Sequence, residues 1–338
     1  MISNQKFFIK NLKNIVFFGY SEKFKDLINI NNEYKIKTLI ITGSDQIKLI
    51  NDDIKVFLYN KLNQNFKKFI KKKLEVNETL FVSLGARYIF NLKIINFFQN
   101  NLVNFHGSRL PLDAGGGGFS WRIMREDRID SQLVHLINKT IDQGPIIDSE
   151  ISLFPKNCKI PKDFEEFRLK NFLIFYKKFI KKIIDKSELN LKIQPNYLGR
   201  YNPRLHTIKD GIIDWSMNSY DLINFIDAFD DPYNGATTYL NNQNFGRLHI
   251  KNAQLHGGDS SNHPFMSGVV SRHDKKWIVV NTAGKHMLLI EKVIDRNGNN
   301  IISKIKVGDR FFNKLIDIEK GKSIKTKYNS KGFIKRSN

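Results

Sequence analysis

The feature that most constrains the fold is a series of short, uninterrupted apolar runs in the first third of the chain. The runs occupy residues 14–19, 38–42, 56–59, 80–84 and 102–105. Apolar runs of this length are typical of strands that are buried on both faces of a parallel sheet. The segments between them have helical spacing, at residues 21–29, 45–51, 66–74 and 92–99. The pattern predicts a Rossmann-like α/β domain with a parallel-rich sheet and a site beyond the carboxyl ends of its strands.

The second half of the chain has a different periodicity. A long amphipathic helix is predicted over residues 163–184, and a Pro- and Gly-containing stretch follows at 194–204. Beyond a helix at 220–229, strand-like segments occur at residues 237–240, 247–255, 268–271, 277–281 and 287–293. These elements predict a small, OB-like β-barrel. Because 338 residues exceed one typical domain, we expect a catalytic domain (1–190), a linker (191–205), a barrel-like domain (206–318) and a basic tail (319–338).

Charge and cysteine content limit the classes of partner. Fifty-five Lys and Arg against 33 Asp and Glu give a formal charge of +22, which by itself suggests a nucleic-acid partner. Most of this excess lies in residues 61–73, 177–186 and 320–338, which are distant in sequence from the candidate site described next. The single cysteine, Cys158, excludes an intramolecular disulfide. No long uncharged apolar run occurs, so we expect a cytoplasmic protein without a membrane partner.

Residues with catalytic potential gather between positions 104 and 147. In an extended chain Asn104 and His106 point to the same side, because the side-chain period of a strand is two. An imidazole can carry protons near neutral pH, an amide N–H can donate to an oxyanion, and a carboxylate such as Asp142 can orient the imidazole. Together these groups suit acyl transfer to an amine. The histidines lack a ligand set at metal-site spacing, so no metal is expected.

Each part of this pattern also has a purely structural interpretation. An Asn-His pair at a strand end is common in capped turns, and Asp142-Gln143-Gly144 is an ordinary turn signal. His135 lies in an apolar run, which favours a core or pocket-lining histidine. The joint order of the parts is what favours a function.

That order closely resembles the N10-formyltetrahydrofolate-dependent formyltransferases. The resemblance rests on two motifs, Asn104-x-His106-x-Ser108-x-Leu-Pro and, further on, His135-Leu-Ile-(x)4-Asp142-x-Gly-Pro-Ile. Residues 210–215 and 231–236 are similar to the carboxyl-terminal domain shared by methionyl-tRNA formyltransferases and nucleotide-sugar N-formyltransferases. The resemblance implies a formyltransferase with Asn104, His106 and Asp142 as its catalytic triad, in which Asp142 raises the pKa of His106 and a protonated His106 steadies the oxyanion.

The resemblance also implies N10-formyltetrahydrofolate as co-substrate and further binding residues. On the folate side the candidates are Phe81, Ser83, Leu84, Ile141 and Gly144. On the acceptor side they are Ser108, Arg109, Gly116, Gly117 and Trp121. Where many relatives have Ser-Leu-Leu-Pro and then Arg-Gly, this chain has Ser-Arg-Leu-Pro and a glycine run at residues 115–118. This departure leaves the role of the acceptor-side loop open.

Three acceptors compete within the resemblance. Glycinamide ribonucleotide formyltransferases normally end near the first domain, which the length of this chain argues against. Methionyl-tRNA formyltransferases usually carry a basic insertion after the second strand, whereas residues 41–56 here pass directly between strands. We therefore expect a small amine, the amino group of a nucleotide-linked sugar, with methionyl-tRNA as the alternative acceptor. A catalytically inactive folate- or RNA-binding protein is a second alternative, and a second copy of the chain is a further candidate partner.

Overall fold

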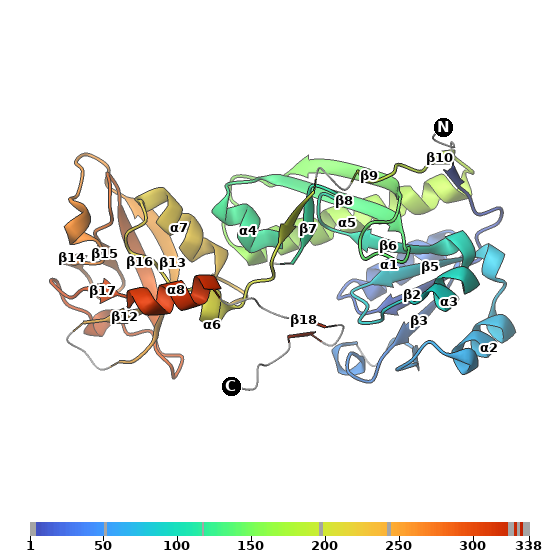
Figure 1. Ribbon diagram of the computed structural model, residues 1–338, viewed down its shortest axis with the longest axis horizontal. Helices are drawn as coiled ribbons and strands as arrows, with labels where there is room; N and C mark the ends of the chain where they lie inside the picture. Colours follow the sequence, from blue (N-terminus) through green and yellow to red (C-terminus); the bar gives the residue numbers. More distant parts are fainter. Residues whose placement is uncertain are drawn as a thin grey trace.

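The computed structural model describes residues 5–50, 53–116, 118–195, 199–241, 245–323, 328–329 and 332–333. They form an amino-terminal and a carboxyl-terminal lobe side by side along the long axis of the molecule (Figure 1). Within these described ranges, no helix is both long and apolar enough to cross a membrane.

The amino-terminal lobe is built on a seven-stranded sheet. Its strands are β2 (Asn14–Gly19), β3 (Lys37–Thr42), β4 (Val56–Leu58), β5 (Thr79–Leu84), β6 (Leu102–His106), β8 (Ile129–Leu136) and β9 (Ile146–Leu153). The order is β4-β3-β2-β5-β6-β8-β9, with parallel pairing from β4 to β6 and antiparallel pairing beyond. This confirms the mixed α/β class with a parallel-rich sheet. The five parallel strands lie where the apolar runs predict them, whereas the β8–β9 hairpin has no predicted counterpart.

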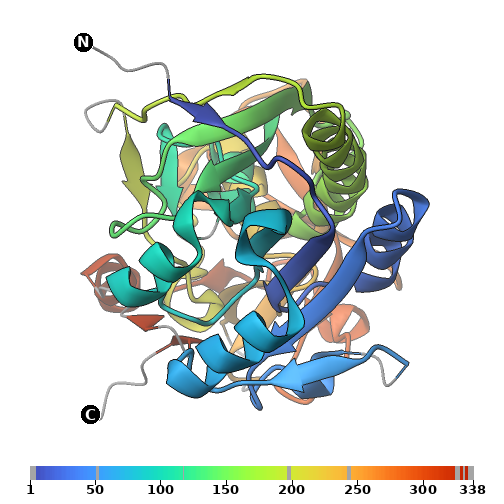
Figure 2. The same ribbon diagram turned by 90° about the vertical axis from the view of Figure 1, so that its right-hand side faces the viewer.

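Helices cover both faces of this sheet (Figure 2). One face packs against α1 (Phe24–Glu33) and α5 (Pro161–Ile184), and the other against α2 (Gln64–Lys73) and α3 (Leu92–Phe97). The helix expected over residues 45–51 is wrong: only a 3-10 turn, η1 (Ile47–Leu49), forms there. The buried side chain of Gln46 donates to the carbonyl oxygen of Gly85 at 3.0 Å. This bond fixes a tight turn where a helix was predicted.

Shorter elements complete the amino-terminal lobe. They are β1 (Lys6–Phe7), which pairs with β10 (Leu189–Asn190), and the 3-10 turns η2 (Val76–Glu78) and η3 (Gln99–Asn101).

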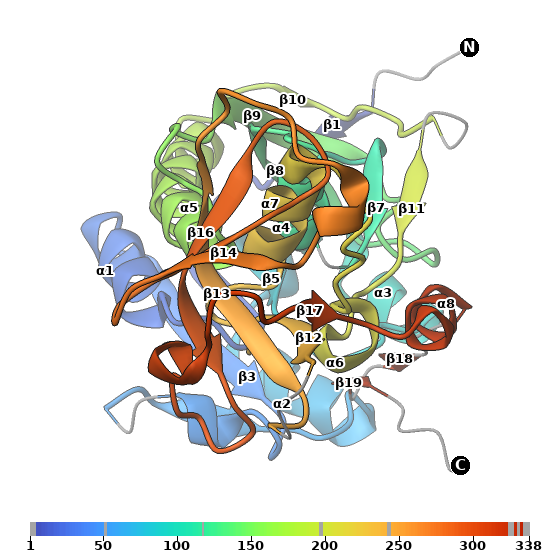
Figure 3. The ribbon, with the colours of Figure 1, turned by 90° about the vertical axis from the view of Figure 1, so that its left-hand side faces the viewer.

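The carboxyl-terminal lobe is a curled antiparallel sheet packed against one helix, α7 (Ser219–Ala228) (Figure 3). In spatial order the strands are β14 (Val270–His273), β15 (Ile278–Val280), β16 (Met287–Ile294), β13 (Leu248–His256), β12 (Ala236–Leu240) and β17 (Phe311–Phe312). The Val270 N–H donates to the carbonyl of Asp309, and the Phe311 N–H to that of Gly268, each at 2.8 Å. These bonds join the two edges, so the sheet forms a partial barrel. The finer OB-like assignment stays a prediction.

The remaining elements from residue 207 onward are short. They are α6 (Thr207–Asp210), η5 (Pro264–Met266), η6 (Ile302–Lys304), α8 (Leu315–Ser323), β18 (Tyr328–Asn329) and β19 (Gly332–Phe333). Helix α8 includes the first residues of the predicted basic tail, and most of the tail lies outside the described residues.

The two lobes are joined by more than a linker. Strand β7 (Asp113–Gly115) pairs in parallel with β11 (Arg200–Asn202), so backbone hydrogen bonds tie the predicted linker to the catalytic lobe. The glycine run at residues 115–118 was expected to form a loop. Its first residue instead ends strand β7, and its last residue begins helix α4 (Gly118–Met124). Helix α4 packs on α7, where the Ser120 hydroxyl donates to the Ala228 carbonyl at 2.7 Å. The lobes thus share a packed boundary.

Candidate active site

Strand β6 carries the first two candidate residues near the middle of the sheet. Phe105 faces α5 and packs against Phe172, Tyr176 and Phe179. The alternation of side chains along a strand then sends Asn104 and His106 to the opposite side. The Asn104 Nδ2 atom lies 3.5 Å from His106 Nδ1.

The turn between β8 and β9 brings Asp142 to the same place. Asp142 Oδ1 lies 3.9 Å from His106 Nδ1 and 3.9 Å from Nε2 of His135. The Gln194 side-chain amide holds this turn, because it donates to the carbonyls of Asp142 and Gly144 at 2.9 and 2.7 Å. A Cβ atom at Gly144 would lie 1.6 Å from the Leu136 carbonyl oxygen, so only glycine fits there. We call Asn104, His106, His135 and Asp142 the reacting centre.

Burial governs the protonation of the two histidines. It lowers the pKa of His106 to about 4; Asp142 acts in the opposite direction, while His135, Arg168 and Arg122 lower the pKa further. Burial likewise lowers the pKa of His135. Asp142 acts in the expected direction and raises the pKa of His106, but the expectation of a protonated His106 is corrected, because desolvation of the imidazolium outweighs the attraction of one carboxylate. Both imidazoles are neutral at neutral pH.

The reacting centre is compact enough to be considered as a metal site. Ligand atoms of His106, His135 and Asp142 lie within 4.8 Å of one another. The amide nitrogen of Asn104, however, lies within 3.5 Å of both imidazoles, and an amide N–H is a donor that repels a cation. The expectation of a metal-free mechanism stays a prediction.

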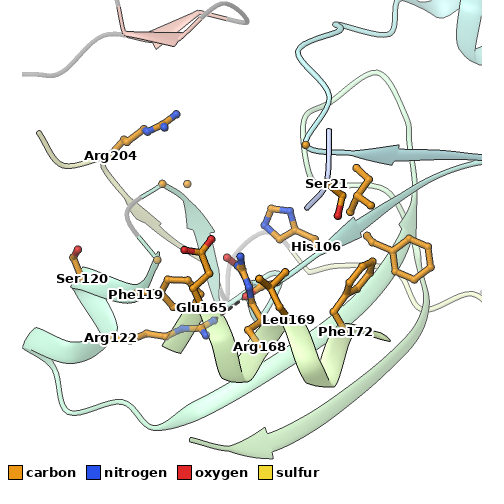
Figure 4. Close-up of a pocket in the computed structure, with 18 of the residues that line it drawn as sticks. Ser21, His106, Phe119, Ser120, Arg122, Glu165, Arg168, Leu169, Phe172 and Arg204 are labelled. Atoms are coloured by element: carbon orange, nitrogen blue, oxygen red, sulfur yellow. Dashed lines mark hydrogen bonds between the residues drawn. The ribbon is translucent and has the colours of Figure 1, made fainter. Parts of the chain in front are cut away.

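A cavity of about 670 Å³ opens beside His106 between the two lobes. It is lined by the ends of β5 and β6, by α4 and α5, by the linker, and by Phe229 and Tyr233 of the carboxyl-terminal lobe. Figure 4 shows Arg168 and Glu165 rising from α5 and Arg204 reaching in from the linker. Such a cavity is large enough for a small-molecule acceptor next to the reacting centre.

Three arginines line this cavity, Arg122, Arg168 and Arg204, and together they form what we call the arginine wall. Arg122 is only 2% exposed, and its Nη1 atom has no hydrogen-bond partner among the described residues. The Arg168 guanidinium lies over the ring of Phe119, 4.5 Å from its centroid. Burial lowers the pKa of both guanidiniums. Buried cations of this kind favour an anionic ligand, because a ligand charge offsets the cost of burying them.

Close packing at the end of β6 positions Arg168. A Cβ atom at Gly107 would lie 2.6 Å from Nη1 of Arg168, so the glycine leaves room for the guanidinium. Arg122 donates to the Gly107 carbonyl at 3.3 Å. Gly107 therefore connects the catalytic strand to the arginine wall.

The folate-side candidates lie in different surroundings. Phe81 is buried in the core and packs on Phe98 with ring centroids 4.0 Å apart. Ser83 is buried on β5 beside Asn104, and Leu84 lines the cavity. Ile141 is 78% exposed on the turn that carries Asp142 and Gly144. Their assignment to folate stays a prediction.

The acceptor-side candidates divide into two groups. Ser108 and Gly116 line the cavity. Arg109 forms ion pairs with Asp113 and Asp127 at 3.0 and 2.8 Å, and Trp121 donates its indole N–H to the Pro203 carbonyl at 2.7 Å. The last two therefore have structural contacts of their own. Gly117 lies outside the described residues.

Sequence reasoning did not identify Arg122, Arg168 or Glu165. One signal was available: Phe164, Arg168 and Phe172 are four residues apart on α5, so an arginine interrupts the apolar face of the helix. A charge in such a position indicates a buried contact or a ligand. Arg122 has no comparable signal, because α4 is too short to define a face.

The chain is similar in sequence to known formyltransferases. The model of the formyl transferase C-terminal domain matches residues 207–304. A methionyl-tRNA formyltransferase of Mycoplasma capricolum is 25% identical over 295 residues, which cover 84% of each chain. The bifunctional polymyxin resistance protein ArnA of Wigglesworthia glossinidia brevipalpis is 25% identical over 201 residues, which cover 60% of this chain and 30% of that one.

Solved structures extend the similarity. An N-formyltransferase from Helicobacter canadensis, in complex with folinic acid and dTDP-3-aminofucose, has a TM-score of 0.61 at 17% identity and covers 83% of this chain and 99% of that one. WlaRD, a sugar 3N-formyltransferase solved with dTDP and 5-N-formyl-THF, has a TM-score of 0.58 at 19% identity, with coverage of 83% and 97%. At these identities the likeness establishes the fold. Together with the sequence matches it confirms the resemblance and supports a formyltransferase enzyme.

Proposed function

We propose that the chain transfers the formyl group of N10-formyltetrahydrofolate to the amino group of a nucleotide-linked sugar. The observation that carries this proposal is the arginine wall beside the reacting centre, in a cavity sized for a small molecule. A nucleotide-linked sugar carries a diphosphate, which would meet the guanidinium groups of Arg168 and Arg122. The solved neighbours support the donor and the acceptor class, because they bind formyl-folate compounds and dTDP or a dTDP-linked amino sugar.

The chemistry assigns one role to each residue of the triad. The amine nitrogen attacks the formyl carbon, a C–N bond forms, and the carbonyl oxygen becomes an oxyanion that accepts a hydrogen bond from Asn104 Nδ2. Neutral His106 takes the proton that the amine loses. Its Nε2 atom is suited to this, since it has no hydrogen-bond partner among the described residues. Asp142 stabilises the resulting imidazolium.

The tetrahedral species then collapses. The bond between the formyl carbon and N10 of the folate breaks, and N10 receives the proton that His106 holds, which yields the formamide and tetrahydrofolate. A low His106 pKa suits this cycle, because the free enzyme must present a base and the imidazolium must give up its proton readily.

Methionyl-tRNA is the alternative acceptor, and one observation favours it. The Mycoplasma capricolum relative, a methionyl-tRNA formyltransferase, matches this chain over 84% of its length. Against it stands the connection between β3 and β4, which contains the short turn η1 and no large insertion. We therefore keep the amino sugar as the leading acceptor.

The test is the release of tetrahydrofolate, followed spectrophotometrically with several acceptors. The panel contains dTDP- and UDP-linked amino sugars, the same nucleotides linked to sugars without an amino group, and methionyl-tRNA. We expect turnover with at least one amino-sugar nucleotide and none with its amine-free counterpart. Turnover with methionyl-tRNA alone would contradict the acceptor, and absence of turnover with all of them would favour the inactive binding protein.

A further inference from the structure

We propose that His135 is a positioning residue: it holds the Asn104 amide so that an N–H group, and not the carbonyl oxygen, meets the oxyanion. The inference rests on the proposed formyl transfer and deepens it. Asn104 Nδ2 lies 3.2 Å from His135 Nε2, and His135 Nδ1 lies 2.8 Å from the carbonyl oxygen of Leu136.

The first step of the argument fixes the tautomer of His135. A carbonyl oxygen can only accept a hydrogen bond, so Nδ1 of His135 must carry the proton that it donates to Leu136. Burial lowers the pKa of this imidazole, so the ring is neutral and Nε2 has a lone pair. Nε2 is therefore an acceptor.

The second step fixes the amide. Asn104 can satisfy the Nε2 lone pair only with its NH2 group, because its Oδ1 atom is itself an acceptor. One N–H is thus bound to His135, and the second N–H is left to donate to the oxyanion beside His106, whose Nδ1 is 3.5 Å from the same nitrogen. A flipped amide would place two acceptors against each other at His135 and a carbonyl oxygen at the reacting carbon. The tautomer of a buried histidine therefore decides the polarity of the site.

The third step is that the fold fixes this contact. Asn104 on β6 and His135 on β8 are direct partners in the antiparallel register, although they are 31 residues apart in sequence. His135 is only 2% exposed, so water does not compete for Nε2. A cross-strand neighbour at this spacing lies within reach of a direct side-chain hydrogen bond.

Two substitutions of His135 separate positioning from a structural role. Glutamine places its terminal amide near the Nε2 position, so His135→Gln can keep an acceptor for Asn104. Asparagine places its amide near Nδ1, so His135→Asn keeps only the bond to Leu136. We expect His135→Gln to keep kcat within about threefold of wild type. His135→Asn should lower kcat by on the order of 10²-fold with little change in the KM for N10-formyltetrahydrofolate.

A double variant tests whether His135 acts through Asn104. If it does, adding His135→Asn to Asn104→Ala should lower kcat by less than about threefold more, since the partner is already gone. Additive losses would overturn the inference. An active His135→Asn together with an impaired His135→Gln would also overturn it. That result is expected if the only function of His135 is its hydrogen bond to the Leu136 carbonyl.

The tautomer of His135 can be measured directly in the wild-type protein, without an acceptor substrate and without any variant that might fail to fold. Nitrogen-15 NMR of the wild-type protein should show His135 protonated at Nδ1 and unprotonated at Nε2. A ring protonated at Nε2 would overturn the inference. If the wild-type protein uses no acceptor in the panel, the proposed function fails, and this measurement still decides whether His135 Nε2 accepts the hydrogen bond from Asn104.

Discussion

His106 of the reacting centre and the arginine wall line one cavity, but the two regions are built in opposite ways. The reacting centre lies on the adjacent strands β6 and β8 and on the turn that follows β8, where register fixes His135 beside Asn104 and burial keeps both histidines neutral. The arginine wall comes from α4, α5 and the linker, and it carries the positive charge. Under the proposed function, bond-making belongs to the sheet and acceptor recognition to the elements packed around it. Substitutions in the arginine wall should then change acceptor binding without changing the chemical step.

The largest effect should come from removing the base. His106→Ala should lower kcat by at least about 10²-fold, because no other neutral imidazole of the reacting centre lines the cavity among the described residues. Turnover is measured by tetrahydrofolate release and folding by circular dichroism. The matched control is His273→Ala, which removes an exposed histidine of the carboxyl-terminal lobe and should leave the rate unchanged. A His106→Ala enzyme with a normal rate would remove His106 from the mechanism.

A smaller effect should follow from disturbing the turn that carries Asp142. Gly144→Ala introduces a Cβ 1.6 Å from the Leu136 carbonyl oxygen, so the turn must shift and move Asp142. We expect kcat to fall by roughly tenfold or more, since small misplacements of catalytic groups are costly. The melting temperature should also fall. Unchanged kinetics and melting would show that the turn is not fixed as described.

A substitution in the arginine wall should change the KM for the acceptor more than it changes kcat. Arg168→Gln should raise the KM for an amino-sugar nucleotide by roughly tenfold and change kcat little, because a charged hydrogen bond to phosphate is lost in ground and transition state alike. Lys177→Gln, at an exposed position of the same helix, is the matched control. If Arg168→Gln lowers kcat and leaves KM unchanged, the division between the two regions is wrong.

The smallest effect should come from protonation of His106, and it should be seen in the free energy of unfolding as the pH falls. Its folded pKa of about 4 lies below the ordinary value of 6.5, so protonation favours the unfolded chain. The contribution is fully present above pH 6.5 and should be lost as pH falls toward 4, lowering the free energy of unfolding by roughly 1–3 kcal/mol. Urea unfolding across this range measures the loss, and His106→Gln should flatten the profile. An equal slope in both proteins would contradict the low pKa.

Local patterns were sufficient to predict much of the molecule. The parallel strands are predictable because burial on both faces leaves uninterrupted apolar runs, as at Asn14–Gly19. The spacing of Asn104 and His106 predicts their convergence, since the period of a strand is two. Asp142 was predicted to join them from the resemblance, and the structure brings it within 3.9 Å of His106.

The rest depends on contacts between distant segments. The pairing of β7 with β11 involves two three-residue strands with no apolar alternation, so neither is visible in the sequence. The protonated state expected for His106 was wrong, because burial lowers its pKa by more than Asp142 raises it, and the cost of burial is set by packing that local sequence does not show. The role of His135 requires the register of β6 and β8, which local sequence does not specify.

The pairing of β7 with β11 has a consequence for how such a chain can be divided. A fragment ended before the linker would keep Asn104, His106 and Asp142 but lose Arg204 and, with it, the cavity surface supplied by Phe229 and Tyr233. The unit that encloses the cavity is therefore larger than the lobe that contains the candidate triad. If the proposed function holds, exchanging the carboxyl-terminal lobe between relatives would transfer part of the acceptor site, and the useful crossover point lies before β11.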